Sequence, residues 1–369
     1  MNRLFKKKLL LSLLFLSLSL FLFIGERTVF AFTFNGFGDI RYRKSNDGTD
    51  TTEGNDGNFA LGQLDLYASE DISDRLSILV ELVVESDEQG EWVIDGERME
   101  VGYLFSDALT IRAGRFHNLL GFWNHAYHHG AHLQTTIDRP EFLEFEDEAG
   151  ILPTHIVGLW AKGKTEILPF VLNYGFMVGN GSRLKSVKDD QGNIVGAVLD
   201  PNNVTDNNRD KSVSVNLMLR PVQSIGNGFG IFGNISQVEE NETGINIDQL
   251  ISGAYFFYTA LPFEFISEYY KIRDEDNNKN NDYSSSAYYI QGGYNIGRAK
   301  PYIRYENLSV KEDDPYFNAL GTEDNTRIVG GVRLNLAIKS SLKIEVRGID
   351  EQDKDNKFTE YAVQWSFAF

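Results

Sequence analysis

Regular alternation between apolar and polar residues runs through most of this chain and restricts its possible folds. The last segment, Phe358–Phe369, shows the alternation most clearly. Its apolar phase holds Tyr361, Val363, Trp365 and Phe367, and its polar phase holds Glu360, Gln364 and Ser366. Successive side chains of a β-strand point to opposite faces, so a period of two residues indicates strands. About sixteen such segments can be counted. The sequence therefore predicts an all-β protein with an even number of antiparallel strands.

The polar connections between these segments alternate in length. Long connections are expected at residues 45–58, 86–95, 117–154, 179–210, 239–244, 274–284, 310–325 and 350–356. Short ones are expected at 71–74, 106–108, 162–165, 260–262, 297–299 and 339–341, with 221–227 of moderate length. Short turns at one end and long loops at the other are typical of outer-membrane β-barrels. The aromatic C-terminus, Phe369, resembles the terminal signal of such barrels. We therefore expect a transmembrane antiparallel β-barrel of about 16 strands.

The charged residues collect in one phase of each segment. Residues 342–347, for example, place Lys343, Glu345 and Arg347 in one phase and Leu342, Ile344 and Val346 in the other. A charge on the lipid face near the bilayer centre costs roughly 2–4 kcal/mol, and a closed barrel leaves no backbone edge unpaired in hydrocarbon. The charged phase should therefore line a wet lumen. A soluble β-sandwich with its apolar face inward has the same alternation and is the alternative fold.

The N-terminal segment has the features of an export signal. Lys6, Lys7 and Lys8 precede an apolar run over residues 9–24, and Val29-Phe30-Ala31 fits a signal-peptidase site. We expect a signal peptide at residues 1–31 and the barrel at residues 32–369, with an N-terminal membrane anchor as the alternative.

The net charge of −18 argues against nucleic acid as a partner. Since the chain has no cysteine, disulfides, thiolate metal sites and CxxCH-attached haem are excluded, and no cofactor is expected.

Residues 117–154 lack the alternation and are too long for a hairpin turn. Five of the six histidines lie in this segment, and His155 follows it directly. We expect this segment, the third long loop, to fold into the lumen and narrow it. The residues predicted to line the pore or its constriction are Arg112, Arg115, His117, Trp123, His125, His128, His129, His132, Glu141, Glu144, Glu146 and Asp147.

A family resemblance coincides with the start of this loop. Residues 111–122, IRAGRFHNLLGF, resemble the strand end of the phosphate-selective porin O/P family. The resemblance implies a trimeric outer-membrane porin whose third loop folds inward. His117 stands where that family usually has a lysine, and no run of lysines lines the loop. The phase assignment places nine bases and nine acids in the lumen, so phosphate selectivity is not expected.

The histidines allow a more specific hypothesis. If residues 124–133 are helical, His125, His129 and His132 share one face and can reach one transition metal. In the alternative, these rings form a polar-aromatic wall with Trp123 and Tyr127. Neutral histidines of this kind would become charged near pH 6. The acids at residues 141–148 either give the pore a weak cation preference or pair with lumen arginines such as Arg112.

Taken together, these features predict a passive channel for small hydrophilic solutes or ions. Its partners would be outer-membrane lipid and two further copies of the chain in a homotrimer. An enzyme is not expected, since the histidine-rich loop has no Gly-x-Ser-x-Gly sequence near it. Two alternatives are open: a plugged barrel that acts as a sheath or receptor, and a metal-ion-selective channel.

Overall fold

The computed structural model of the protein describes residues 33–46, 57–86, 92–128, 130–144, 150–189, 191–200, 204, 210–351 and 356–369. The expected signal peptide, residues 1–31, lies outside these ranges. The second of two compact units, Phe34–Phe369, holds the barrel. Among the residues described, no helix is long and apolar enough to cross a membrane.

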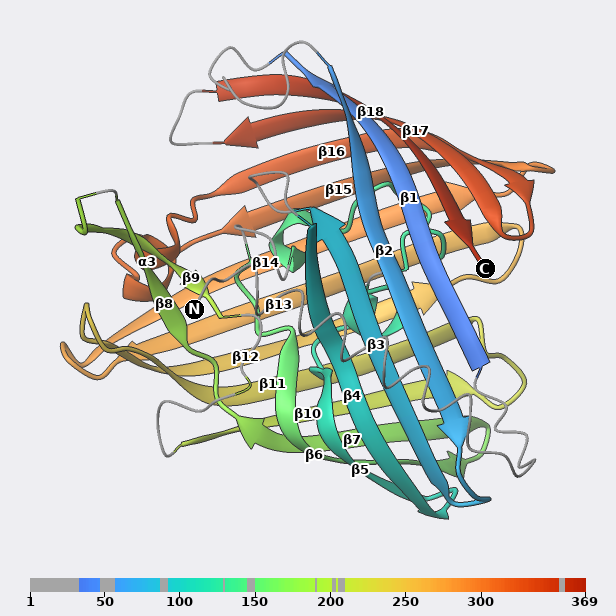
Figure 1. Ribbon diagram of the computed structural model, residues 1–369, viewed down its shortest axis with the longest axis horizontal. Helices are drawn as coiled ribbons and strands as arrows, with labels where there is room; N and C mark the ends of the chain where they lie inside the picture. Colours follow the sequence, from blue (N-terminus) through green and yellow to red (C-terminus); the bar gives the residue numbers. More distant parts are fainter. Residues whose placement is uncertain are drawn as a thin grey trace, which may run out of the picture. The chain divides into compact units, whose positions relative to one another are not determined.

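Sixteen strands of the described chain close into one antiparallel barrel, as the sequence predicts (Figure 1). They are β1 (Thr33–Ser45), β2 (Asn58–Asp71), β3 (Leu76–Ser86), β4 (Trp92–Ser106), β5 (Leu109–His117), β6 (His155–Ile167), β7 (Phe170–Asn180), β10 (Lys211–Pro221), β11 (Asn227–Glu240), β12 (Ile245–Tyr258), β13 (Phe263–Asp276), β14 (Asn281–Tyr294), β15 (Ala299–Ser309), β16 (Asn325–Ala337), β17 (Ser340–Glu351) and β18 (Asn356–Ala368).

The first and last strands close the barrel. Figure 1 shows β1 in blue beside β18 in red, and their register pairs Ile40 with Trp365 and Tyr42 with Val363. The Phe369 amide continues the ladder by donating to the Gly36 carbonyl over 3.1 Å. Every strand of the barrel therefore has two neighbours, which is the arrangement that hydrocarbon requires of a spanning sheet.

The two phases of each strand have opposite environments. Ile344, Val346 and Trp365 point outward and are 47%, 46% and 53% exposed, whereas the inward-facing Lys343 and Gln364 are fully buried. Inside, acids and bases form pairs such as Arg112 with Glu100 and Arg304 with Glu306, each at 2.6 Å. The outer face of the barrel is therefore apolar, and its inner face carries paired charges together with apolar side chains that β11–β14 turn inward. A closed barrel with an apolar outer face excludes the sandwich.

Two connections expected to be long are tight turns. Only residues 241–244 join β11 to β12, and only residues 277–280 join β13 to β14. The polar ends of these strands continue the ladder, where Ile247 pairs with Asp276 and Val238 pairs with Ile247. Polar composition suggested loops at these positions because strand ends that extend past the apolar band face water on both sides.

Three of the long connections contain secondary structure of their own. The third connection contains a short helix, α2 (Trp123–Ala126), and one 3₁₀ turn, η1 (Glu141–Leu143). The fourth contains a hairpin of β8 (Leu184–Lys188) and β9 (Ile194–Leu199), and the seventh contains α3 (Pro315–Leu320). Apolar side chains from all three insertions join one buried cluster with those of the strands.

A β-bulge in β4 changes which side chains enter the lumen. Glu81 pairs with Arg98 and Leu82 pairs with Gly96, which leaves Glu97 as the extra residue. Because a bulge shifts the alternation by one residue, both Glu97 and Arg98 face inward. Glu97 is only 2% exposed.

Candidate functional site: the loop inside the barrel

We call residues 118–154, which join β5 to β6, the inner loop. Its described residues, 118–128, 130–144 and 150–154, run inside the barrel, as predicted (Figure 1). Its first anchor is Glu268 on β13. The Glu268 carboxylate accepts hydrogen bonds from the backbone amides of Phe122 and Trp123, both at 2.8 Å. Gly121 has a φ of 71°, and a Cβ there would lie 1.9 Å from the Tyr270 hydroxyl. Glycine is therefore needed where the chain turns onto this carboxylate.

The middle of the inner loop is held through its backbone. Lys343 donates from Nζ to the carbonyls of Ala131 and Thr136 at 2.6 and 2.7 Å. Arg333 donates to the Gln134 carbonyl at 2.7 Å, and Glu345 accepts the Ile137 amide at 2.6 Å. Inward-facing charges of β16 and β17 thus satisfy loop groups that no regular secondary structure pairs.

Asp138 is the most strongly held acid of the inner loop. Its carboxylate lies 2.6 Å from Arg347, 2.7 Å from Arg43 and 3.2 Å from Arg41. Burial alone would raise its pKa, but these three guanidinium groups lower the pKa of Asp138 well below its ordinary value. Arginines of β1 and β17, the two neighbours of β18, therefore bind the same loop residue.

The acidic end of the inner loop is only partly described. Glu141 pairs with Arg327, and its amide donates to Glu306 over 2.7 Å. The alternative that these acids pair with lumen arginines therefore holds at Glu141, although its partner is Arg327 and not Arg112, which contacts Glu100. Glu144 lies directly after η1. Glu146 and Asp147 lie outside the described residues.

The metal hypothesis required a helix over residues 124–133, but α2 ends at Ala126. His128 has a φ of 24°, and the Gly130 amide donates to the Tyr127 carbonyl in a tight turn. Positive φ is incompatible with a continued right-handed helix. The helical spacing that would align His125, His129 and His132 is therefore absent.

The histidines of the expected metal set lie in different surroundings. His125 is exposed to a cavity described below, with its ring 6.3 Å from that of Trp160. His132 contacts the Ile338 carbonyl through Nε2 at 3.2 Å. His129 lies outside the described residues. Although His125 faces the cavity, the surrounding barrel removes bulk water from both rings. This desolvation and nearby cations, Lys162 for His125 and Arg333 for His132, lower the pKa of both.

Trp123 belongs to an aromatic group in the barrel. Its ring packs edge-on against Tyr127 at 4.9 Å and Tyr289 at 5.8 Å, and the Arg304 guanidinium lies 5.8 Å from its centre. Trp123 is fully buried. The aromatic side chain therefore fixes the loop rather than facing a solute.

Three histidines and one glutamate meet where β4, β5 and β6 face the inner loop. His117 ends β5 and pairs in register with His155, which begins β6. His128 reaches them from the inner loop, and Glu97 reaches them from the bulge in β4. One possible ligand atom of each lies within 4.8 Å of those of the other three. Arg115, also predicted at the site, contacts Nδ1 of His155 at 2.9 Å.

Sequence reasoning found two members of this group, which we call the His₃Glu cluster, and missed two. Glu97 was missed because strict alternation cannot reveal a bulge. His155 was noted only as the neighbour of the histidine-rich loop. The signal for His155 was available, since residues at the two ends of a loop between adjacent strands oppose each other in the ladder.

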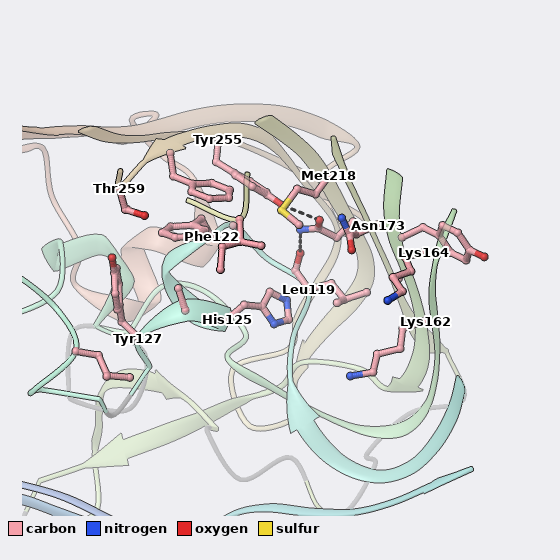
Figure 2. Close-up of a pocket in the computed structure, with 18 of the residues that line it drawn as sticks. Leu119, Phe122, His125, Tyr127, Lys162, Lys164, Asn173, Met218, Tyr255 and Thr259 are labelled. Carbon is pink, nitrogen blue, oxygen red and sulfur yellow. Dashed lines mark hydrogen bonds between the residues drawn. The ribbon is translucent and has the colours of Figure 1, made fainter. Parts of the chain in front are cut away.

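A cavity of about 870 Å³ lies between the inner loop and the short-turn end of the barrel. Figure 2 shows Phe122, His125 and Tyr127 contributing from the loop, and Lys162 and Lys164 from β6. The Asn216 amide donates to the Leu119 carbonyl at 3.1 Å and accepts from the Tyr255 hydroxyl at 2.8 Å, as the dashed lines mark. The loop thus forms one wall of a mixed aromatic and polar chamber.

Solved structures with the same architecture are outer-membrane proteins. An anion-selective porin from Comamonas acidovorans matches with a TM-score of 0.62 at 13% identity, over 92% of this chain and 99% of that one. The barrel has the porin fold. The outer-membrane channel DcaP of Acinetobacter baumannii matches with a TM-score of 0.60 at 11% identity, over 92% of this chain and 97% of that one. A trimer form of OmpT from Vibrio cholerae matches with a TM-score of 0.52 at 13% identity, over 92% of this chain and all of that one.

The sequence itself gives no further assignment within the porin fold. No protein-family model matches it, and none of the curated proteins compared with it matches. The resemblance of residues 111–122 to the phosphate-selective porin O/P family is therefore not confirmed.

Within that segment, Gly114 has a φ of 138°, and a Cβ there would lie 1.9 Å from the Met99 carbonyl oxygen.

Proposed function

We propose that the protein is a water-filled channel for the passive diffusion of small hydrophilic solutes and ions. The observation that carries this proposal is a closed barrel of sixteen strands with ion pairs on its inner face, a long loop folded inside it and a cavity of about 870 Å³ beside that loop. Barrels of this strand number enclose an aqueous lumen unless something fills it. Such a channel needs no catalytic group.

We infer that the channel lies in a bacterial outer membrane and is a homotrimer. The outward-facing apolar phase supports insertion into lipid, and the sequence of residues 1–31 supports export. The OmpT trimer has the same fold and supports three copies. Detergent-solubilised protein should therefore run as a trimer in native gels and on size-exclusion with light scattering.

We further propose a weak preference for anions. Three lysines, Lys162, Lys164 and Lys300, line the cavity, against two acids, Asp107 and Glu264. Lys300 pairs with Glu264 at 2.9 Å, and Lys162 lies 4.2 Å from the centre of the Trp160 ring. The comparison with an anion-selective porin is consistent with this preference. The acids at residues 141–148 oppose it, and Glu141 is paired with Arg327.

Planar-bilayer recording tests both parts of the proposal. The wild-type protein should give stepwise openings. In a KCl gradient, its reversal potential should have the sign expected of a chloride-selective pore. Replacing Lys162 and Lys164 with Gln should shift that potential toward the value for potassium. Replacing Lys357, which is on β18 and pairs with Asp350 outside the cavity, should leave it unchanged. A wild-type protein that never conducts would refute the channel, and a potassium-type potential would refute the anion preference alone.

A second candidate function, a plugged barrel that acts as a sheath or receptor, is favoured by the apolar packing around the inner loop. Tyr316 and Phe317 of α3 and Leu184 of β8 share one buried cluster with Phe142 and Ile151 of the loop. The Tyr316 hydroxyl also donates to the Ile151 carbonyl at 2.8 Å. Absence of conductance from correctly folded protein would favour this candidate.

A further inference from the structure

The His₃Glu cluster combines residues from four separate parts of the chain at one buried point. Glu97, His117, His128 and His155 are 2%, 6%, 6% and 2% exposed. Three of them belong to the barrel wall, on β4, β5 and β6. His128 belongs to the inner loop. A contact among these four side chains therefore joins the loop to the wall.

Two of the three histidines direct Nε2 at the glutamate. The Nε2 atom of His155 lies 2.9 Å from Oε2 of Glu97, and Nε2 of His128 lies 3.8 Å from the same oxygen. The rings of His117 and His128 are 3.7 Å apart between centres. We propose that Glu97, His117, His128 and His155 bind one zinc-class transition-metal cation that fastens the inner loop to the barrel wall.

The donor set fits a closed structural site. Three imidazoles and one carboxylate make four ligands, which is the number that structural zinc sites use. Bonds of about 2.0–2.1 Å in a tetrahedron place ligand atoms about 3.3 Å apart. The four atoms already lie within 4.8 Å of one another, so side-chain rotations bring them to that spacing. With all four positions filled by protein, the ion has a structural role.

Asn124 prepares His128 for this role. The Nδ1 atom of His128 lies 2.7 Å from Oδ1 of Asn124, and an amide oxygen only accepts hydrogen bonds. The proton of neutral His128 is therefore on Nδ1, which leaves the Nε2 lone pair directed at the cluster. Orientation of a ligand histidine through its other nitrogen is the usual arrangement in metal sites. The positive φ of His128 is consistent with a backbone held for a specific contact.

The contact of Arg115 with His155 affects how the ion binds. Its guanidinium donates to Nδ1 of His155 over 2.9 Å, which places the proton of neutral His155 on Nε2, facing Glu97. Binding a cation at Nε2 requires this proton to leave or to move to Nδ1. If it moves to Nδ1, Arg115 must turn away, because both groups then carry a hydrogen at this contact. Metal binding should therefore release or relocate one proton at His155, and Arg115→Gln should bind the ion at least as well as the wild-type protein.

The test uses the full barrel refolded in detergent with ZnCl₂ or with EDTA, because a buried ion exchanges slowly in folded protein. We expect one zinc per chain by elemental analysis, a higher melting temperature with zinc than with EDTA, and a visible absorption band of tetrahedral cobalt after refolding with CoCl₂. Wild-type protein that folds with stoichiometric ZnCl₂ and retains none would overturn the proposal.

Variants separate this site from binding elsewhere. Glu97→Gln and His128→Ala should each weaken zinc retention at least about tenfold and remove the zinc-dependent rise in melting temperature. His125→Ala, a matched change in the same loop outside the cluster, should bind zinc as the wild-type protein does. Folding of each variant is checked by heat-dependent gel mobility. Undiminished zinc binding by folded Glu97→Gln and His128→Ala would contradict the assignment.

Discussion

Asp138 of the inner loop and Arg347 of β17 lie 2.6 Å apart. Arg347 also contacts Glu345 at 2.7 Å and Glu360 of β18 at 2.6 Å. The guanidinium therefore has two partners in the barrel wall and one in the loop. This distribution allows the loop contact to be removed while the wall contacts are kept.

Replacing Asp138 with Asn should loosen the inner loop. The change leaves Arg41, Arg43 and Arg347 without the carboxylate they share, and removing one partner of a mostly buried ion network costs about 3 kcal/mol of unfolding free energy. Conductance should rise or become noisier as the loop moves. Glu360→Gln is the matched control, because it removes a wall partner of the same arginine. Urea unfolding and single-channel recording measure both effects. Equal conductance in Asp138→Asn and Glu360→Gln would show that Asp138 does not hold the loop.

The stabilisation from Asp138 should persist in mild acid. Its three arginines lower the pKa of Asp138 in the folded protein well below the ordinary value of 3.8, and burial opposes them only in part. A carboxylate with a lowered pKa stabilises the fold fully above its unfolded pKa and loses this effect as the pH falls toward the folded pKa. The difference in unfolding free energy between wild type and Asp138→Asn should be constant from pH 8 to 5 and shrink below about pH 4. A difference that shrinks already between pH 7 and 5 would contradict this.

The expected charging of His125 and His132 near pH 6 should not occur. Desolvation inside the barrel and neighbouring cations lower the pKa of both rings, that of His125 to about 4, so His125 is neutral at pH 6 and His132 takes up its proton at a lower pH than a free histidine. A histidine with a lowered pKa reduces stability as the pH falls below its unfolded value, because the unfolded chain takes up the proton first. Between pH 7.5 and 5.5, the conductance of the double variant His125→Asn, His132→Asn should follow that of the wild type. A pH step present in the wild type and absent in the variant would refute this.

Gly114 should not tolerate alanine. A Cβ at this position would lie 1.9 Å from a backbone oxygen of β4, and its φ of 138° is one that residues with side chains rarely adopt. Gly114→Ala should lower the unfolding free energy by about 3 kcal/mol or block barrel assembly. Gly348→Ala on β17 is the control, since nothing lies within 4 Å of its added Cβ. Thermal unfolding in detergent compares them, and equal stability of the two variants would contradict the model of a glycine required at the loop-bearing strand.

The barrel could be predicted from the sequence because its determinants are local. Alternation in residues 342–347 and 358–369 assigns one phase to lipid and the other to the lumen, and the structure confirms both assignments at Ile344, Lys343 and Trp365. The position of the inner loop was also predictable, since residues 117–154 break the alternation.

The details of the site depend on interactions that alternation does not encode. The bulge at Glu97 reverses the phase of one strand partway along. After α2, His128 has a positive φ and the Gly130 amide donates to the Tyr127 carbonyl, a local geometry that alternation does not predict. The partner of Glu141 is Arg327, which is 186 positions later in the sequence and is adjacent only after the barrel closes. Such pairings require the register of all the strands and not the pattern of any one.

The central claim is that the inner loop lines a conducting path. Because the chain has no cysteine, thiol modification of single introduced cysteines tests this claim directly. Leu133 of the loop lines the cavity and is 48% exposed, whereas Ile344 is 47% exposed on the outer face. A charged methanethiosulfonate reagent added to Leu133→Cys channels should reduce single-channel current in discrete steps, and current through Ile344→Cys channels should not change. Unchanged current through modified Leu133→Cys channels, or equal effects at both positions, would contradict a conducting path along the inner loop.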